Sequence, residues 1–312
     1  MRRRGRLAPS PTGVLHLGNA RTFLLAWLDA RARGAAVLLR IEDLDGPRVR
    51  RGAAEDAIAG LRWLGLDWDE GPVYQSTRLE RYARALQRLV GAGLAYPCTC
   101  TRKDVELAAS APHAGEEGPI YPGTCRGRSR DAAEALAAGA RGPAWRFAVP
   151  PEARVRFHDR FRGPGTVAVA RELGDFVVWK SSGEPAYQLA VVVDDAEMGI
   201  SDVLRGDDLW PSAARQILLF DALGWRAPEY AHVPLVVGED GRRLAKRHGD
   251  TTLRRFRLAS WSSEDLVGFL AWSCGLAPAG ARRTPERLLH DFDLSRLPPA
   301  PFVWREAMLV RP

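Results

Sequence analysis

The chain has 312 residues, 46% of them apolar, and a formal net charge of +7. It can bury a full core, as one large domain or two modest ones. No apolar signal segment follows the basic start, and no stretch approaches the roughly 18 apolar residues of a membrane span, so we expect a cytoplasmic protein without membrane contact. The charge favours a polyanionic partner. Four cysteines are too few for a disulfide scaffold.

The first third alternates strand and helix patterns. Residues 6–8 predict a strand, residues 9–13 a rigid loop of prolines and glycine, and residues 20–34 a helix. The run 36–41 is apolar except for one residue, as expected of a parallel strand covered on both faces. Two more helices are predicted at about 52–65 and 78–92.

The middle of the chain, about 96–145, loses this rhythm, and we interpret it as an insertion with a short helix near 131–138. Strand-like runs then return, and the last part is expected to be a short tail. The predicted strands are 175–179, 189–193 and 233–237, and the predicted helices are about 212–223 and, in the tail, 263–274.

The segment from Ser10 to Asn19 lies between a predicted strand and a predicted helix. Its glycines permit close backbone approach, the new helix offers free N–H groups, and His16 can donate to a phosphate oxygen. It lacks the patterns of a P-loop or a dinucleotide fold, and His-x-Gly alone is more often structural. We interpret it as a phosphate-binding loop because a second basic element, Arg243 to Gly249, follows a strand and a turn. There, Lys246 can close on a triphosphate.

Six motifs in order carry a resemblance. They are 6–13 (RLAPSPTG), 16–19 (HLGN), 40–43 (RIED), 190–195 (AVVVDD), 205–208 (RGDD) and 246–249 (KRHG). Over residues 6–250 the chain resembles the catalytic domain of glutamyl-tRNA synthetases, and the first and last motifs resemble the HIGH and KMSKS signatures of class I. The resemblance implies an α/β fold with a Rossmann-like core, a parallel sheet with helices on both faces.

The resemblance also implies roles for single residues in an ATP-dependent ligase. Glutamate-binding positions map to Arg6, Leu7, Ala8, Pro9, Ser10, Glu42, Tyr187 and Arg205. Positions for ATP map to His16, Gly18, Asn19 and Lys246, with His16 and Lys246 as catalytic groups and Mg²⁺ accompanying ATP. Arginine forks suit carboxylates and Glu42 suits an ammonium group. Arg243 and Ala245 depart from the usual Lys-Leu-Ser-Lys of the second loop.

The acceptor is inferred from the short stretch of chain after Lys246. Only 66 residues remain there, by the subtraction 312 − 246, so we expect no anticodon-binding domain. This shortening resembles the branch of the family that passes glutamate to the queuosine base in the anticodon of tRNA(Asp). Alternatives are a truncated glutamyl-tRNA synthetase charging the 3′ end of tRNA(Glu), and a non-catalytic paralogue that binds tRNA or senses glutamate. No protein partner is evident, so we expect a monomer.

A cysteine cluster in the insertion suits zinc. Cys98, Cys100 and Cys125 supply three thiolates, and a tetrahedral site needs a fourth ligand. His113 is the chemical default, whereas the resemblance to the shortened branch favours Tyr121; reduced cysteines without zinc are a third option. Cys274 is expected to be a buried apolar residue.

The chain is expected to divide into four segments. Residues 1–95 are the first half of the catalytic domain, 96–145 the zinc-binding insertion, 146–250 the second half with the KMSKS-like loop, and 251–312 a short helical tail. Three arginine groups are candidates for RNA backbone contact: Arg48/Arg50/Arg51, Arg126/Arg128/Arg130 and Arg254/Arg255/Arg257.

Overall fold

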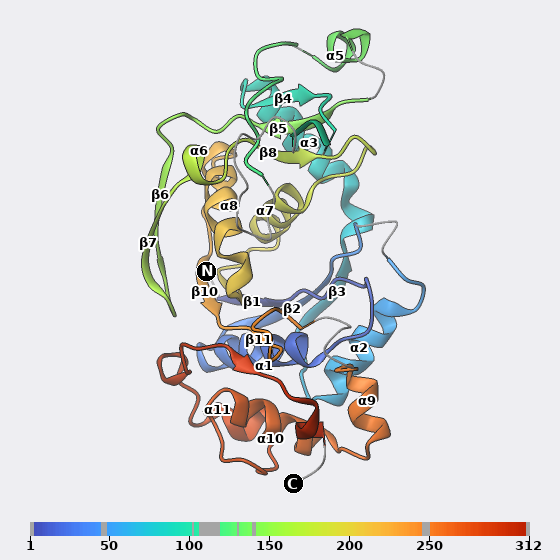
Figure 1. Ribbon diagram of the computed structural model, residues 1–312, viewed down its shortest axis with the longest axis vertical. Helices are drawn as coiled ribbons and strands as arrows, with labels where there is room; N and C mark the ends of the chain where they lie inside the picture. The colour runs from blue at the N-terminus through green and yellow to red at the C-terminus, as the bar shows by residue number, and fades with distance from the viewer. Residues whose placement is uncertain are drawn as a thin grey trace.

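The computed structural model describes residues 3–44, 49–101, 103–105, 119–129, 131–138, 142–244 and 250–309. Its centre is a twisted parallel sheet with helices on both faces (Figure 1). Strands β1 (Arg4–Leu7), β2 (Ala36–Ile41) and β3 (Glu70–Tyr74) pair in that order, and β9 (Asp202–Gly206) pairs with β10 (Glu229–Val233). A hydrogen bond of 2.9 Å from Ser201 N to Arg4 O joins the two groups. The predicted α/β class is confirmed.

The first third agrees closely with the sequence pattern. All six residues of β2 are buried, which matches its apolar run. Helix α1 (Leu17–Ala32) covers one face of the sheet and is followed by Gly34 at φ +65°, a conformation that suits glycine. Helices α2 (Ala53–Trp63) and α3 (Leu79–Gly91) lie where the two further helices were predicted, with a 3₁₀ turn at Gln75–Arg78 between β3 and α3.

The insertion is built on a small antiparallel sheet. Strand β4 (Ala95–Cys98) pairs with β5 (Ala144–Phe147), and β5 pairs with β8 (Phe176–Trp179). From the sequence we assigned 175–179 to the second half of the catalytic domain, whereas β8 completes the sheet of the insertion. Helix α5 (Ala132–Ala138) lies at its far end (Figure 1).

One predicted strand is wrong. Residues 189–193 belong to helix α7 (Tyr187–Glu197), whose residues from Leu189 to Asp195 are all buried. A short run of valines is typical of a strand, but periodicity cannot separate a buried strand from a helix that is covered on all sides. Helix α7 packs beside α3 and α8 (Trp210–Ala222) in an apolar cluster on the other face of the sheet.

The remaining strands lie at one edge of the core. Strand β6 (Arg154–Asp159) forms a hairpin with β7 (Gly163–Ala168), and its last residue pairs with Tyr230 of β10. The short helix α6 (Val169–Glu172) follows β7. The hairpin lies beside α8 (Figure 1).

The tail packs against α1 from outside the sheet. Three helices occur in its described part, α9 (Leu253–Leu258), α10 (Ser263–Ser273) and α11 (Pro285–Leu289), where the sequence predicted one. Strand β12 (Phe302–Val303) pairs with β11 (Val236–Val237), and short 3₁₀ turns lie at 207–209, 294–296 and 306–309. Cys274 is fully buried in the apolar core between α1 and the tail, as predicted. Among the helices of the described ranges, none combines the length and apolar content that a membrane crossing requires.

Candidate active site and metal centre

A cavity of about 560 Å³ opens where β1, β2 and β9 end. The carboxyl ends of parallel strands are where ligands bind in open α/β sheets. The cavity gathers most of the residues that the sequence singled out: Arg6, Ala8, Pro9, Ser10, His16, Gly18, Asn19, Glu42, Tyr187 and Arg205. Leu7 does not line it, because its side chain is fully buried in the apolar core under α1. Lys246 lies outside the described residues.

His16 is the N-cap of α1. Its Nδ1 accepts the N–H groups of Gly18 at 3.1 Å and Asn19 at 3.4 Å, and the Asn19 side-chain oxygen accepts the N–H of His16 at 3.3 Å. Because Nδ1 accepts, the ring proton is on Nε2, which leaves one N–H for a ligand. Burial, and next the charge of Arg243, lower the pKa of His16 to about 4. His16 is therefore a neutral ring with one free donor, which agrees with the hydrogen bond to a phosphate oxygen expected from the sequence.

Gly18 touches the His16 ring. A Cβ added at Gly18 would lie 3.1 Å from Cε1 and 3.2 Å from Nδ1 of His16. A side chain at this position would therefore require the imidazole to shift by a few tenths of an ångström, which strains its capping hydrogen bonds. The absence of a Cβ keeps both the helix N-terminus and the ring in place.

Glu42 and Arg6 share a buried ionic cluster behind the cavity. The fully buried Arg40 donates to Glu42 at 2.9 Å and to Asp195 at 2.6 Å, and Arg6 Nε lies 3.2 Å from Asp195. Burial lowers the pKa of Arg40, but Asp195, Glu42 and Asp194 outweigh it and hold the pKa above its usual value. Arg40 and Asp195 belong to motifs in the sequence, yet no pattern there indicated that they hold the two site residues.

Arg205 also lines the cavity and is 4% exposed. Its three hydrogen bonds go to His232 Nε2 at 2.9 Å, Gln216 Oε1 at 2.9 Å and the Leu209 carbonyl at 3.2 Å. Tyr187, at the start of α7, is 39% exposed and lines the same cavity. The sequence indicated neither His232 nor Gln216, since neither belongs to a motif that it could identify.

Arg243 and Asp208 also line the cavity and pair with each other at 2.8 Å. Both lie in segments that stand out as motifs in the sequence, where neither had an assigned role. Arg243 thus brings a positive charge beside His16 in the described part of the basic loop.

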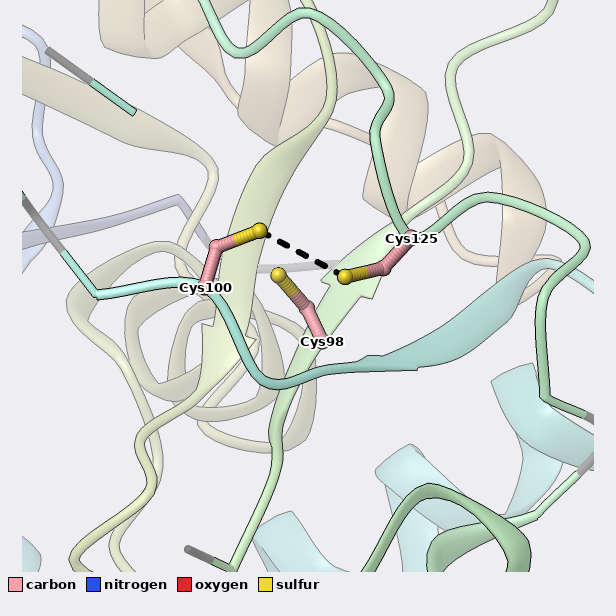
Figure 2. Close-up of side chains that lie close together, drawn as sticks. All are labelled: Cys98, Cys100 and Cys125. Atoms are coloured by element: carbon pink, nitrogen blue, oxygen red, sulfur yellow. Dashed lines mark hydrogen bonds between the residues drawn. The ribbon is translucent and has the colours of Figure 1, made fainter. Parts of the chain in front are cut away.

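The sulfurs of Cys98, Cys100 and Cys125 point toward one another (Figure 2) and all lie within 4.8 Å. The pair Cys100 and Cys125 is 3.5 Å apart, and the Tyr121 hydroxyl lies 3.4 Å from Cys98 Sγ and 3.6 Å from Cys100 Sγ. In a tetrahedral zinc site with bonds of about 2.3 Å to sulfur and 2.0 Å to oxygen, these separations are about 3.8 and 3.5 Å. The four residues therefore fit zinc. His113 lies outside the described residues.

The electrostatics of this cluster also suit a cation. Burial raises the pKa of the Cys100 thiol to about 11. At Cys125 burial is again the largest influence, but the hydrogen bonds from Tyr121, the Thr99 backbone and the two other cysteines together outweigh it and lower the pKa to about 6. Arg146 donates to Cys98 Sγ at 3.3 Å, and its guanidinium lies 3.7 Å from the centre of the Tyr121 ring. Several thiolates this close together require a positive partner.

The chain is similar in sequence and in fold to known proteins. The chain is 51% identical to a glutamyl-Q tRNA(Asp) synthetase of Symbiobacterium thermophilum, over 95% of this chain and 94% of that one. It is 44% identical to glutamate–tRNA ligase 2 of Halorhodospira halophila, over 87% of this chain and 57% of that one. A glutamate tRNA ligase of Elizabethkingia meningosepticum in complex with its amino acid superposes with a TM-score of 0.81 at 28% identity, covering 99% of this chain and 68% of the other. The family model of the class I tRNA synthetases (E and Q), catalytic domain, matches residues 3–282, and the chain belongs to that family.

Proposed function

We propose that the protein activates L-glutamate with ATP and transfers it to the queuosine base in the anticodon of tRNA(Asp). The observation that supports it most is that one cavity is lined both by two arginines and a carboxylate and by the N-cap of α1. The first set suits an amino acid and the second suits phosphate. The named activity of the relative from S. thermophilum, aligned over 94% of its length, supports the acceptor.

In the first step, a carboxylate oxygen of glutamate attacks the α-phosphorus of ATP. The bond from that phosphorus to the bridging oxygen breaks, pyrophosphate leaves, and glutamyl-adenylate remains. Arg205 and Arg6 are assigned to glutamate carboxylates, and Glu42 to its ammonium group. The Nε2–H of His16 donates to a phosphate oxygen where negative charge develops.

In the second step, a hydroxyl of the tRNA attacks the activated carbonyl carbon, and AMP leaves with the bonding electrons. No covalent intermediate with the enzyme is needed, so orientation and electrostatics supply the catalysis. Lys246 is assigned to phosphate charge. Mg²⁺, when bound with ATP, would neutralise part of the same charge.

We further propose one structural zinc ion held by Cys98, Cys100, Cys125 and Tyr121. The support is the donor set, three sulfurs and a phenolic oxygen at separations that a tetrahedral ion requires. The site lies in the insertion, away from the cavity lining. Its role is therefore to fold the insertion and not to take part in the transfer.

Two of the arginine groups flank the cavity and are proposed to contact the RNA backbone. The N–H of Arg50 donates to the Pro11 carbonyl at 3.1 Å, and an isolated β-bridge joins His16 to Thr252, the cap of α9. Arg254 and Arg255 are exposed on the first turn of α9. Anionic RNA approaching the cavity would pass these side chains. Arg126 and Arg128 lie in the insertion, and Arg48 and Arg130 lie outside the described residues.

The proposal is completed by cytoplasmic localisation, a monomeric state and the domain boundaries from the sequence, except that β8 belongs to the insertion. The deciding experiment incubates the protein with ATP, labelled glutamate, and tRNA(Asp) with or without queuosine. We expect label on queuosine-containing tRNA(Asp) alone. Label on tRNA(Glu), or equal labelling of tRNA(Asp) with and without queuosine, would favour the second candidate, a synthetase that charges the 3′ end of tRNA(Glu). The similarity to the glutamate–tRNA ligase of H. halophila supports this candidate. No label and no exchange of pyrophosphate into ATP would favour a non-catalytic protein.

A further inference from the structure

We propose that Asp159 and His232 form a buried relay that positions Arg205, and are therefore positioning residues of the glutamate site. The inference rests on the proposed function, since it assigns Arg205 to a glutamate carboxylate. Neither residue lines the cavity, and both are fully buried behind it.

Sheet pairing brings the three residues into line. Asp159 ends β6, His232 lies in β10, and Arg205 lies in β9 as the direct partner of His232 in the parallel register. Asp159 Oδ2 lies 2.6 Å from His232 Nδ1, and Arg205 Nε donates to His232 Nε2 at 2.9 Å. The distances join a carboxylate, an imidazole and a guanidinium in one chain of hydrogen bonds.

The donor and acceptor roles in this chain are determined. A guanidinium has only N–H donors, so His232 Nε2 must accept from Arg205. The ring proton is then on Nδ1, where it meets the carboxylate of Asp159. Burial lowers the pKa of His232, which agrees with a neutral ring that accepts at Nε2. Nδ1 therefore donates to Asp159 and Nε2 accepts from Arg205. A substitution at Asp159 that changes the protonation of the ring would alter the hydrogen bond to Arg205.

Asp159 is itself held by the backbone. Its Oδ1 accepts the N–H groups of Phe161 at 3.0 Å, Arg162 at 2.8 Å and His232 at 3.1 Å. These bonds close the β6–β7 turn and account for the structural role of Oδ1. They do not involve Oδ2, which is hydrogen-bonded to the imidazole of His232. The carboxylate therefore has a turn-forming oxygen and a separate oxygen that orients His232.

The relay leaves Arg205 ready for a carboxylate. A guanidinium has five N–H groups, and among the described residues three are taken, by His232, Gln216 and the Leu209 carbonyl. One N–H remains on each terminal nitrogen, the arrangement that a carboxylate binds. Because Nε donates to His232, a ligand carboxylate cannot bind the edge of Arg205 that is formed by Nε and one terminal nitrogen.

The same network reaches Tyr187 through its neighbour. Gln216 Nε2 donates to Gln188 Oε1 at 3.0 Å, and Gln188 Nε2 donates to the Ser212 hydroxyl at 2.9 Å. Gln188 follows Tyr187 at the start of α7. The relay thus ties one proposed glutamate-binding residue to the helix turn that carries another.

The test compares two substitutions at His232. In His232→Asn the amide can still meet Asp159 but is too short to accept from Arg205; in His232→Gln the side-chain oxygen can take the place of Nε2. We expect His232→Asn to raise KM for glutamate about 10- to 100-fold, the usual effect of losing a hydrogen bond to a charged group, and His232→Gln to restore most of that loss. KM for ATP should change less than about twofold. Both constants come from glutamate-dependent pyrophosphate exchange, and calorimetry of glutamate binding gives a readout independent of turnover.

Asp159→Asn gives a second, independent test. The amide oxygen would keep the three backbone N–H groups, so the NH₂ would face His232 and force its proton to Nε2, against the N–H of Arg205. The imidazole ¹⁵N spectrum should show the Nδ1–H tautomer in the wild type and the Nε2–H tautomer in this variant. Asp175→Asn is the control, because Asp175 is also buried and its carboxylate also accepts both backbone and side-chain donors. These donors are Val149 N–H at 2.8 Å, the Tyr96 hydroxyl at 2.6 Å and Arg126 at 3.4 Å.

Several outcomes would overturn the relay. These are equal glutamate KM values for His232→Asn and His232→Gln, a parallel rise in the KM of both substrates, or an Nε2–H tautomer in the wild type. If Asp159→Asn lowers the melting temperature no more than Asp175→Asn but raises glutamate KM alone, the relay is supported. Absence of glutamate-dependent exchange in the wild type would instead contradict the proposed function, and the tautomer measurement would still test the geometry.

Discussion

The neutral state of His16 makes a sharp prediction about stability against pH. His16→Asn keeps an oxygen that can cap α1 but removes the only titrating group of the cap. The folded chain holds the pKa of His16 at about 4, against 6.5 for an ordinary histidine. Because the folded pKa is lowered, the stabilisation is complete above the unfolded pKa of 6.5 and is lost as pH falls toward 4.

The magnitude is set by proton linkage. Between the two pKa values the unfolded chain binds the proton and the folded chain does not, so the unfolding free energy decreases as the pH is lowered. From about pH 7.5 to about pH 5, the loss from this one group is about 2 kcal/mol. The wild type should therefore lose about 2 kcal/mol more than His16→Asn over this interval.

Urea unfolding of both proteins at these two pH values measures the difference. Other titrating groups, His232 among them, are common to both chains and cancel. A difference below about 0.5 kcal/mol would refute the reasoning, because the ring would then titrate as an ordinary histidine. Such a ring would carry charge at mildly acidic pH, and its proposed role as a neutral donor to phosphate would be wrong.

Three more predictions concern the site and its surroundings. Gly18→Ala should raise KM for ATP about tenfold, since the new methyl displaces the His16 ring; an unchanged KM in pyrophosphate exchange would contradict it. Cys100→Ser should lower zinc content below one ion per chain and lower the melting temperature, and metal analysis of equal zinc in both proteins would exclude the proposed ligand set. Arg254→Ala with Arg255→Ala should weaken tRNA binding and reduce its salt slope by about 1 per lost phosphate contact, with Arg296→Ala in the tail as control; an unchanged slope would remove these residues from the RNA surface.

Much of the proposed ATP-binding part of the site could be located from the sequence because its residues are close neighbours in the chain. His16, Gly18 and Asn19 form one helix start, and their geometry is set by local backbone chemistry. Cys98 and Cys100 likewise lie in one short segment. Only the tertiary structure, however, shows that Cys125 lies beside them. The KMSKS-like loop is recognisable by pattern, while Lys246 lies outside the described residues.

The amino-acid side could be predicted only in part. Arg6, Glu42 and Arg205 were selected by resemblance, but the sequence did not indicate which residues position their side chains. Arg40 and Asp195 are 155 positions apart, and each is an ordinary charged residue until the fold buries both. The helix at 187–197 was also missed, since its burial on every side hides the period that distinguishes helix from strand.

The fold class and the start of α1, where we propose that phosphate binds, could be predicted from the amino-acid order alone. Both depend on apolar periodicity, glycine and capping, all of which act within a few residues. The state of His16 and the orientation of Arg205, by contrast, required the packed chain. A pKa depends on burial and on charges from other segments, and the chain Asp159, His232 and Arg205 exists because β6, β10 and β9 pair side by side.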